Sequence, residues 1–185
     1  MILKTEIASQ KGNMAAFFRG IKTLLLISAV FLTSVTVSAG EEVQKLAAME
    51  GWVHGNVQQV GFRAFIFKQA IRYNLGGFIE NQPDGSVHFI LQGQSVRLDE
   101  ALTFIKQGPE KAVVTDVKVV PCPAWKDIAS VIVKGWTSKS RDFGHPVDLV
   151  YPLRQEDQVL SDVESRQIFK KTIRAAMLSA NKVPR

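Results

Sequence analysis

Residues 53–74 read VHGNVQQVGFRAFIFKQAIRYN, and this stretch sets the architecture because it joins a strand, a loop and a helix. Residues 46–54 are predicted to form the strand that enters the loop. The loop, residues 55–61, has a glycine at each end. Residues 62–74 then place apolar side chains at intervals of three and four, which predicts a helix with one buried face.

The chain beyond this helix alternates between strand and helix patterns. A β-hairpin is predicted around residues 83–85, which read PDG, because proline presets the first turn dihedral and glycine accepts a positive one. Residues 95–107 predict a second amphipathic helix, and the Gly-Pro pair at 108–109 ends it. Residues 113–120 and 129–136 are predicted as strands.

This order of elements predicts the fold class. The chain is predicted to run strand, helix, strand, strand, helix, strand, with one short extra strand. This order implies two split crossovers. We therefore expect an α+β, ferredoxin-like βαββαβ sandwich over residues 46–137, with an antiparallel sheet and both helices on one face. Residues 138–185 are predicted as a C-terminal extension, a loop to residue 157 followed by a helix over about 159–180. Docking of that helix on its own domain and binding to a partner protein stay open as alternatives.

The loop after the first strand is a candidate phosphate site. A strand, a glycine-bounded loop and a helix N-terminus bring several backbone N–H groups around one point, and such an arrangement binds anions, phosphate above all. The guanidinium of Arg63, in the first helical turn, can hold two phosphate oxygens at once. The candidate phosphate-binding residues are Gln58, Gln59, Val60, Gly61, Phe62 and Arg63.

Three segments resemble the acylphosphatase family. VHGNVQQVGFR, residues 53–63, is similar to the family signature V-x-G-x-V-Q-G-V-G-F-R. GGFIENQPDGSVHFILQG, residues 76–93, resembles the second signature, and KQGPEKAVVTDVKVV, residues 106–120, resembles the segment after the second helix. The resemblance covers residues 51–137 in the family's order and spacing.

The resemblance implies an activity and two residue roles. Acylphosphatases hydrolyse the carboxyl-phosphate bond of acyl phosphates without a metal or a cofactor. Arg63 matches their essential arginine, which holds the phosphate, and Asn81 matches their essential asparagine, which positions water. The implied partner is a small-molecule acyl phosphate. Without the resemblance, Asn81 reads as a turn residue before Pro83, and Glu80 alternates away from Asn81 and is predicted to miss the site.

A function of another class stays open: an exported, catalytically weak or inactive binding module on the same fold. Gln59 stands where the family has glycine, and a left-handed backbone there costs about 1 kcal/mol. Residues 138–185 also lie outside the resemblance. Nucleic-acid binding is disfavoured, because residues 1–39 hold four of the 23 Lys/Arg and one of the 17 Asp/Glu, which leaves 19 basic and 16 acidic residues. The RNP aromatic motif is also absent.

The N-terminal segment predicts export. Residues 23–39 read TLLLISAVFLTSVTVSA, an uncharged apolar run preceded by Arg19 and Lys22. This order predicts a secretory signal over residues 1–39 with cleavage after Ala39, and hence a periplasmic or secreted protein. A membrane anchor at residues 23–39 is the alternative, and only in that case is the membrane a partner. Export also separates the chain from acyl phosphates made by kinases inside cells, which favours the binding module.

Overall fold

The structure is a computed structural model, and it describes residues 45–137, 145–156 and 158–180. The predicted signal segment lies outside the described residues. No helix within the described ranges is long and apolar enough to cross a bilayer. The elements, in chain order, are β1 (Leu46–Asn56), α2 (Phe62–Tyr73), β2 (Gly76–Asn81), β3 (Val87–Gln94), α3 (Ser95–Gln107), β4 (Val113–Pro121), β5 (Ser130–Trp136), β6 (Val147–Pro152) and α4 (Asp162–Ala180).

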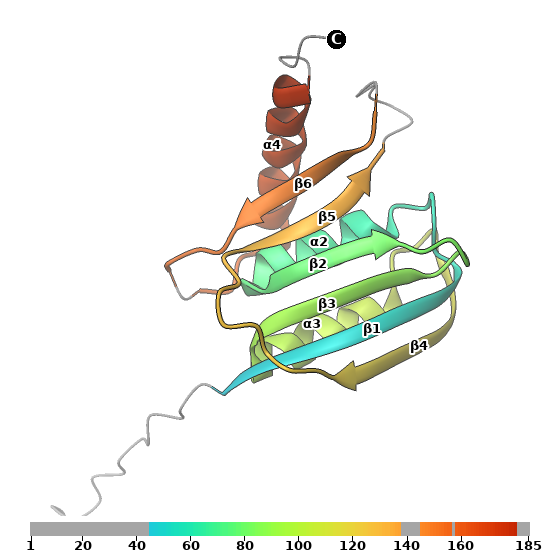
Figure 1. The fold of residues 1–185 in the computed structure, drawn as a ribbon, viewed down its shortest axis with the longest axis horizontal. Coiled ribbons are helices and arrows are strands. Elements are labelled where there is room, and N and C mark those ends of the chain that lie inside the picture. Colours follow the sequence, from blue (N-terminus) through green and yellow to red (C-terminus); the bar gives the residue numbers. More distant parts are fainter. Residues whose placement is uncertain (1–44, 138–144, 157, 181–185) are drawn as a thin grey trace, which may run out of the picture. The chain divides into compact units, whose positions relative to one another are not determined.

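The described strands form one sheet in the order β4-β1-β3-β2-β5-β6 (Figure 1). The first four pair antiparallel and, with α2 and α3, make the predicted ferredoxin-like βαββαβ unit. Strand β5 joins β2 in parallel, with Ile79 opposite Val133, so the whole sheet is mixed rather than antiparallel as predicted. Strand β5 can run parallel to β2 because a long connection follows β4. This connection crosses to the edge of the unit formed by β2, where the chain enters β5 in the same direction as β2.

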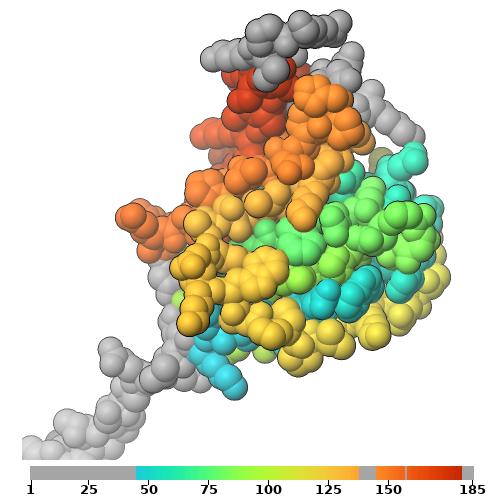
Figure 2. Space-filling view, in the orientation of Figure 1, coloured from blue at the N-terminus to red at the C-terminus, as the bar shows by residue number. Residues whose placement is uncertain are grey.

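This connection, residues 122–129, lies against the face of the sheet that α2 and α3 leave open (Figure 2). Gln92 holds it in place: its Oε1 accepts from the Trp125 N–H at 2.6 Å, and its Nε2 donates to the Trp125 carbonyl at 2.8 Å. The Trp125 ring also stacks on Phe78 of β2, with 5.9 Å between the ring centroids. The connection is therefore fixed to the sheet, and it fixes where β5 begins.

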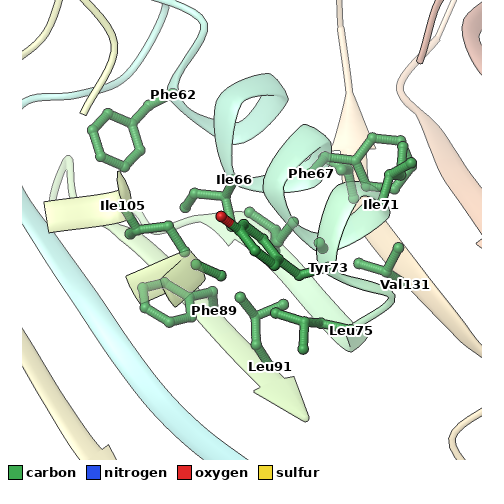
Figure 3. Packing of buried hydrophobic residues seen from close by; sticks show 14 of the residues in the cluster. Phe62, Ile66, Phe67, Ile71, Tyr73, Leu75, Phe89, Leu91, Ile105 and Val131 are labelled. Atoms are coloured by element: carbon green, nitrogen blue, oxygen red, sulfur yellow. The ribbon is translucent and has the colours of Figure 1, made fainter. Parts of the chain in front are cut away.

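Helices α2 and α3 cover the opposite face of the sheet, as predicted (Figure 1). Between these layers lies the core, in which Phe62 and Phe67 of α2, Phe89 of β3 and Ile105 of α3 are each 1% exposed or less (Figure 3). Burial of such side chains is the main driving force for the layered arrangement. The core therefore fixes α2, and with it the loop at the N-terminus of α2.

The prediction of a loop over residues 138–157 is wrong for part of that range. Residues 147–152 form β6, which pairs antiparallel with β5 and places Leu149 opposite Val133. Leu149 is fully buried, while Asp148 and Val150 on either side are exposed. This alternation is that of an edge strand with one face on the core, and the surrounding glycine, proline and charged residues hide it in the sequence.

Helix α4 begins at Asp162 rather than at the predicted residue 159. It packs against α2 and β6, and Phe169 meets Phe67 of α2 edge to face, with 6.1 Å between ring centroids. Ile173 belongs to the same core, and Ala176 and Met177 pack against it. Of the two alternatives for this helix, docking on its own domain is therefore observed.

Candidate functional site

The loop between β1 and α2 turns sharply next to β4. Gly55 has a φ of 119°, and a Cβ on it would lie 2.1 Å from the carbonyl oxygen of Val113, so only glycine allows this close approach. At the other end, Gly61 is the N-cap of α2, and its carbonyl accepts from the Phe65 N–H at 3.0 Å. The N–H groups of the first helical turn have no acceptor within the helix and point out of its N-terminus. This end of α2 therefore has the polarity that an anion requires.

Gln58 fastens this loop to the β2–β3 hairpin. Its Nε2 donates to the carbonyls of Gln82 at 2.8 Å and Ser86 at 2.9 Å. The side chain of Gln58 thus contacts the hairpin, and only its backbone stays a candidate for phosphate. Phe62 is buried in the core, so it too could reach an anion only through its backbone N–H. Gln59, with a φ of 61°, adopts the left-handed backbone that its place in the loop predicts.

Arg63 lies in the first turn of α2 and is partly buried. Its Nη1 donates to the carbonyls of Lys134 at 2.7 Å and Gly135 at 3.1 Å, and its Cζ lies 5.6 Å from the ring centroid of Trp136. Burial lowers the pKa of the guanidinium, but an arginine keeps its charge in proteins. Among the described residues its hydrogen bonds use Nη1 alone, so the Nε and Nη2 donors are available to a ligand.

Asn81 ends β2, where it pairs with Val87 of β3. Its Oδ1 is buried and has no hydrogen-bond partner in the described part of the chain. A buried amide oxygen without a donor is costly, and such groups are common at functional sites. Asn81 directly precedes Gln82, whose carbonyl accepts from Gln58, so the loop and the asparagine lie near one another.

Register brings Arg63 to the same end of the sheet. Ile79 of β2 lies opposite Val133 of the parallel strand β5, and both strands end within three residues of this pair, at Asn81 and Trp136. The Gly135 carbonyl is one of the two that accept a hydrogen bond from Nη1 of Arg63. The structure thus gathers the helix N-terminus, Arg63 and Asn81 at the ends of β2 and β5.

Glu80 lies on the other face of the sheet. Its Oε1 accepts from the Gln82 side chain at 3.0 Å and lies 3.3 Å from Nδ1 of His88. His88 in turn stacks on Trp52, on the face without helices. Glu80 is therefore occupied away from Asn81, in agreement with the alternation of the strand.

The comparisons with known proteins place this site within a recognised family. The family model described as Acylphosphatase matches residues 49–131, which include the loop, Arg63 and Asn81. An acylphosphatase of Methanocella arvoryzae is 40% identical over 74 residues, which cover 40% of this chain and 84% of the relative. An acylphosphatase of Chlorobaculum tepidum is 45% identical over 67 residues, covering 36% of this chain and 73% of the relative. The chain belongs to the acylphosphatase family.

A solved structure of an acylphosphatase from Bacillus subtilis also matches, with 30% sequence identity, a TM-score of 0.43, and coverage of 45% of this chain and 92% of that one. The acylphosphatase family match ends at residue 131, near the start of β5. The rest of β5, including the residues that contact Arg63, and the whole of β6 and α4 lie beyond it. These contacts were not predicted from the sequence, because two of the three groups are backbone carbonyls.

Proposed function

We propose that this protein hydrolyses the carboxyl-phosphate bond of acyl phosphates, releasing a carboxylate and inorganic phosphate. Membership of the acylphosphatase family supports this class of reaction. One observation supports the residue roles: Arg63, in the first turn of α2, binds the Gly135 carbonyl of β5, and the neighbouring strand β2 ends at Asn81, whose Oδ1 is buried without a partner among the described residues. A positive group and a water-binding group at one point are what phosphoryl transfer to water requires.

In the proposed reaction the oxygen of water forms a bond to phosphorus while the bond between phosphorus and the carboxyl oxygen breaks. The carboxylate leaves with the electron pair, and as a good leaving group it needs little acid catalysis. Arg63 and the amides of the α2 N-terminus hold the phosphoryl oxygens and stabilise their charge. Because the enzyme mainly positions the reactants, a preformed site provides most of the rate.

Asn81 is proposed to orient the attacking water. Its Oδ1 accepts a hydrogen bond from the water, and its Nδ2 can donate to a phosphoryl oxygen. The proton of the water passes to the phosphate, so the mechanism calls for no protein base. It also calls for no metal, and the rate should therefore be unchanged by EDTA.

The direct test is the hydrolysis of benzoyl phosphate by the purified protein. We expect Arg63→Ala and Asn81→Ala each to lower kcat/KM by about a hundredfold or more, because loss of one transition-state contact has this effect in other enzymes. Arg63→Lys should also lose most activity while keeping the fold, since lysine cannot bind two oxygens side by side.

Arg72→Ala is the matched control. Arg72 lies on the same helix, and like Arg63 its guanidinium lies over aromatic rings, 5.3 Å from Tyr73 and 5.4 Å from Phe104. It stands at the opposite end of α2, so its loss should affect stability and leave the rate intact. A wild-type protein without activity would contradict the enzyme proposal and leave the binding module. Full activity in the Arg63 and Asn81 variants would contradict the roles proposed for these two residues.

We also propose that the protein is exported, on the basis of the uncharged run at residues 23–39. Sequencing of the mature N-terminus should give Gly40 as the first residue. A chain that retains residues 23–39 and sediments with membranes would instead indicate the anchor.

A further inference from the structure

The groups that hold Arg63 are themselves held by β6 and α4, residues 147–180, which we call the extension. We propose that the extension positions the Arg63 guanidinium for phosphate, so that Asp148 and Phe169 act as positioning residues. This inference rests on the proposed function, because it assigns a role in the same phosphate site. It also gives the extension, which lies outside the family match, a part in the reaction.

The first support is a β-bulge between β5 and β6. Val133 pairs with Leu149 and Trp136 pairs with Val147, so two residues of β5, Lys134 and Gly135, stand opposite the single residue Asp148. The carbonyls of these same two residues accept from Nη1 of Arg63. Bulges turn backbone and side-chain groups away from the regular ladder and are frequent beside active sites. Here the bulge presents two carbonyls to one guanidinium nitrogen.

Asp148 fixes the conformation of this bulge. Its Oδ1 accepts from the Gly135 N–H at 2.8 Å, and Gly135 has a φ of 56°. Without β6, neither the bulge nor this hydrogen bond could form. The direction of the Gly135 carbonyl, and hence one of the contacts to Arg63, therefore depends on a side chain from the extension.

The second support is an aromatic contact from α4. Phe169 meets Trp136 edge to face, with ring centroids 5.9 Å apart and planes at 83°. Trp136 is the ring next to the Arg63 guanidinium. Phe169 also contacts Phe67 of α2, so it ties the Trp136 ring to the helix that carries Arg63. Gly135 and Trp136, which both contact Arg63, are thus each in direct contact with a residue of the extension.

This arrangement restricts a side chain that is otherwise free. An arginine has many rotamers, and a ligand that must select one of them loses affinity. A guanidinium held by two carbonyls and a ring is already oriented before phosphate arrives. Loss of either support should therefore weaken phosphate binding and turnover together, even where the fold persists.

The experiment uses the full chain and two readouts: kcat/KM for benzoyl phosphate, and the affinity for inorganic phosphate by titration calorimetry. We expect Asp148→Ala and Phe169→Ala each to weaken phosphate binding on the order of tenfold, since a displacement of about 1 Å can cost up to a hundredfold in rate. Asp148→Asn keeps the Oδ1 acceptor and should bind within about twofold of wild type.

Leu160→Ala is the matched control for lost packing. Leu160 is a buried residue before α4, 7% exposed, and its N–H donates to the carbonyl of Arg72, at the end of α2 far from Arg63. This variant should melt at a lower temperature and bind phosphate as wild type does. Asp148 is exposed, so Asp148→Ala tests the inference even if Phe169→Ala fails to fold.

Wild-type phosphate affinity in both Asp148→Ala and a folded Phe169→Ala would overturn the inference, as would an equal loss in Leu160→Ala or no recovery in Asp148→Asn. A wild-type protein that binds phosphate without hydrolysing benzoyl phosphate would refute the proposed function alone, and the affinities would still decide the inference. A protein that neither binds nor hydrolyses would refute both.

Discussion

Gln59 combines an exposed side chain with a strained backbone. Its φ of 61° lies in the left-handed region, where a side chain costs about 1–2 kcal/mol. Its side chain makes no hydrogen bond with the residues that the structure describes. The strain therefore lies in the loop between β1 and α2, the candidate phosphate site, without local compensation, as is common at functional sites.

Replacement by glycine should relieve this strain. We expect Gln59→Gly to raise the free energy of unfolding by about 0.5–1 kcal/mol, because the relief exceeds the extra entropy that glycine gives the unfolded chain. Urea unfolding measures the difference, with Gln59→Ala as control, which keeps the Cβ and the strain. Equal stability of the glycine and alanine variants would contradict the assignment of strain to this φ.

Asn74 shows that the same backbone conformation can be compensated. Its φ of 56° resembles that of Gln59. Its side chain, however, donates to the Arg154 carbonyl at 3.1 Å and accepts from the Arg154 N–H at 2.8 Å. Asn74→Gly should therefore gain nothing in urea unfolding, because two hydrogen bonds of about 1 kcal/mol each are lost with the strain. A gain equal to that of Gln59→Gly would show that these bonds contribute little.

At the scale of elements, the start of α4 is set by a capping box. The Ser161 N–H and Oγ both donate to Oε2 of Glu164, at 2.8 Å and 2.7 Å, and the Glu164 N–H donates to Ser161 Oγ at 3.2 Å. The side-chain and then the backbone hydrogen bond from Ser161 lower the pKa of Glu164. The box anchors the helix that carries Phe169.

This cap should make the stability of α4 depend on pH. A carboxyl whose pKa is lowered in the folded state stabilises it above the unfolded pKa, about 4.3 for glutamate, and loses this effect as the pH falls through the lowered value. We expect Glu164→Gln to be less stable than wild type near about pH 7, and the two to converge near about pH 3.

Urea unfolding at both pH values measures this difference. Ser161→Ala, which removes the donor side of the box, should lose about 1 kcal/mol at neutral pH. A difference between wild type and Glu164→Gln that stays the same at both pH values would argue against the carboxylate as the stabilising form.

The extension shows which elements a sequence can and cannot predict. The S-x-x-E pattern of Ser161 and Glu164 is a recognised helix start and could have placed the first residue of α4 correctly. Val147, Leu149 and Tyr151 alternate, but six residues beside glycine and proline do not distinguish an edge strand from a loop. Strand β6 forms because β5 offers it an open edge, which is information from the tertiary structure.

The candidate site likewise has a part that the sequence predicts and a part that only the tertiary structure reveals. Arg63 and Asn81 were predicted, the first from a loop followed by a helix N-terminus and the second from the family resemblance. The supports of Arg63 were not, because a carbonyl belongs to every residue and a bulge arises only from pairing with β6. The parallel pairing of β5 was also missed, since strand direction depends on the path of the connection.

At the scale of the whole molecule, the core continues from the family domain into the extension. Leu149, Leu160 and Ile173 belong to the same buried cluster as Phe67 and Val133. A shared core makes separate unfolding of the extension costly, because it would expose apolar surface on both sides. The described unit should therefore unfold in one cooperative transition.

Leu149→Ala tests this cooperativity. We expect a loss of about 2–5 kcal/mol, as for other fully buried leucines. Tryptophan fluorescence and far-UV circular dichroism should report one transition and shift together. Two separate transitions, with only one of them moved by the substitution, would show that the extension is an independent unit.

Because Arg63 is held by backbone carbonyls of the bulge, the three positions of this contact should differ in the amino-acid substitutions that they tolerate. A saturation-mutagenesis map should be intolerant at position 63 and permissive at the exposed position 134, because any L-amino acid supplies the same carbonyl oxygen there. Position 135 should accept glycine best and asparagine next, since its φ of 56° disfavours other residues. The Lys134 part of this contact is therefore insensitive to substitution, and alignments of related chains would show constraint at positions 63 and 135 but none at 134.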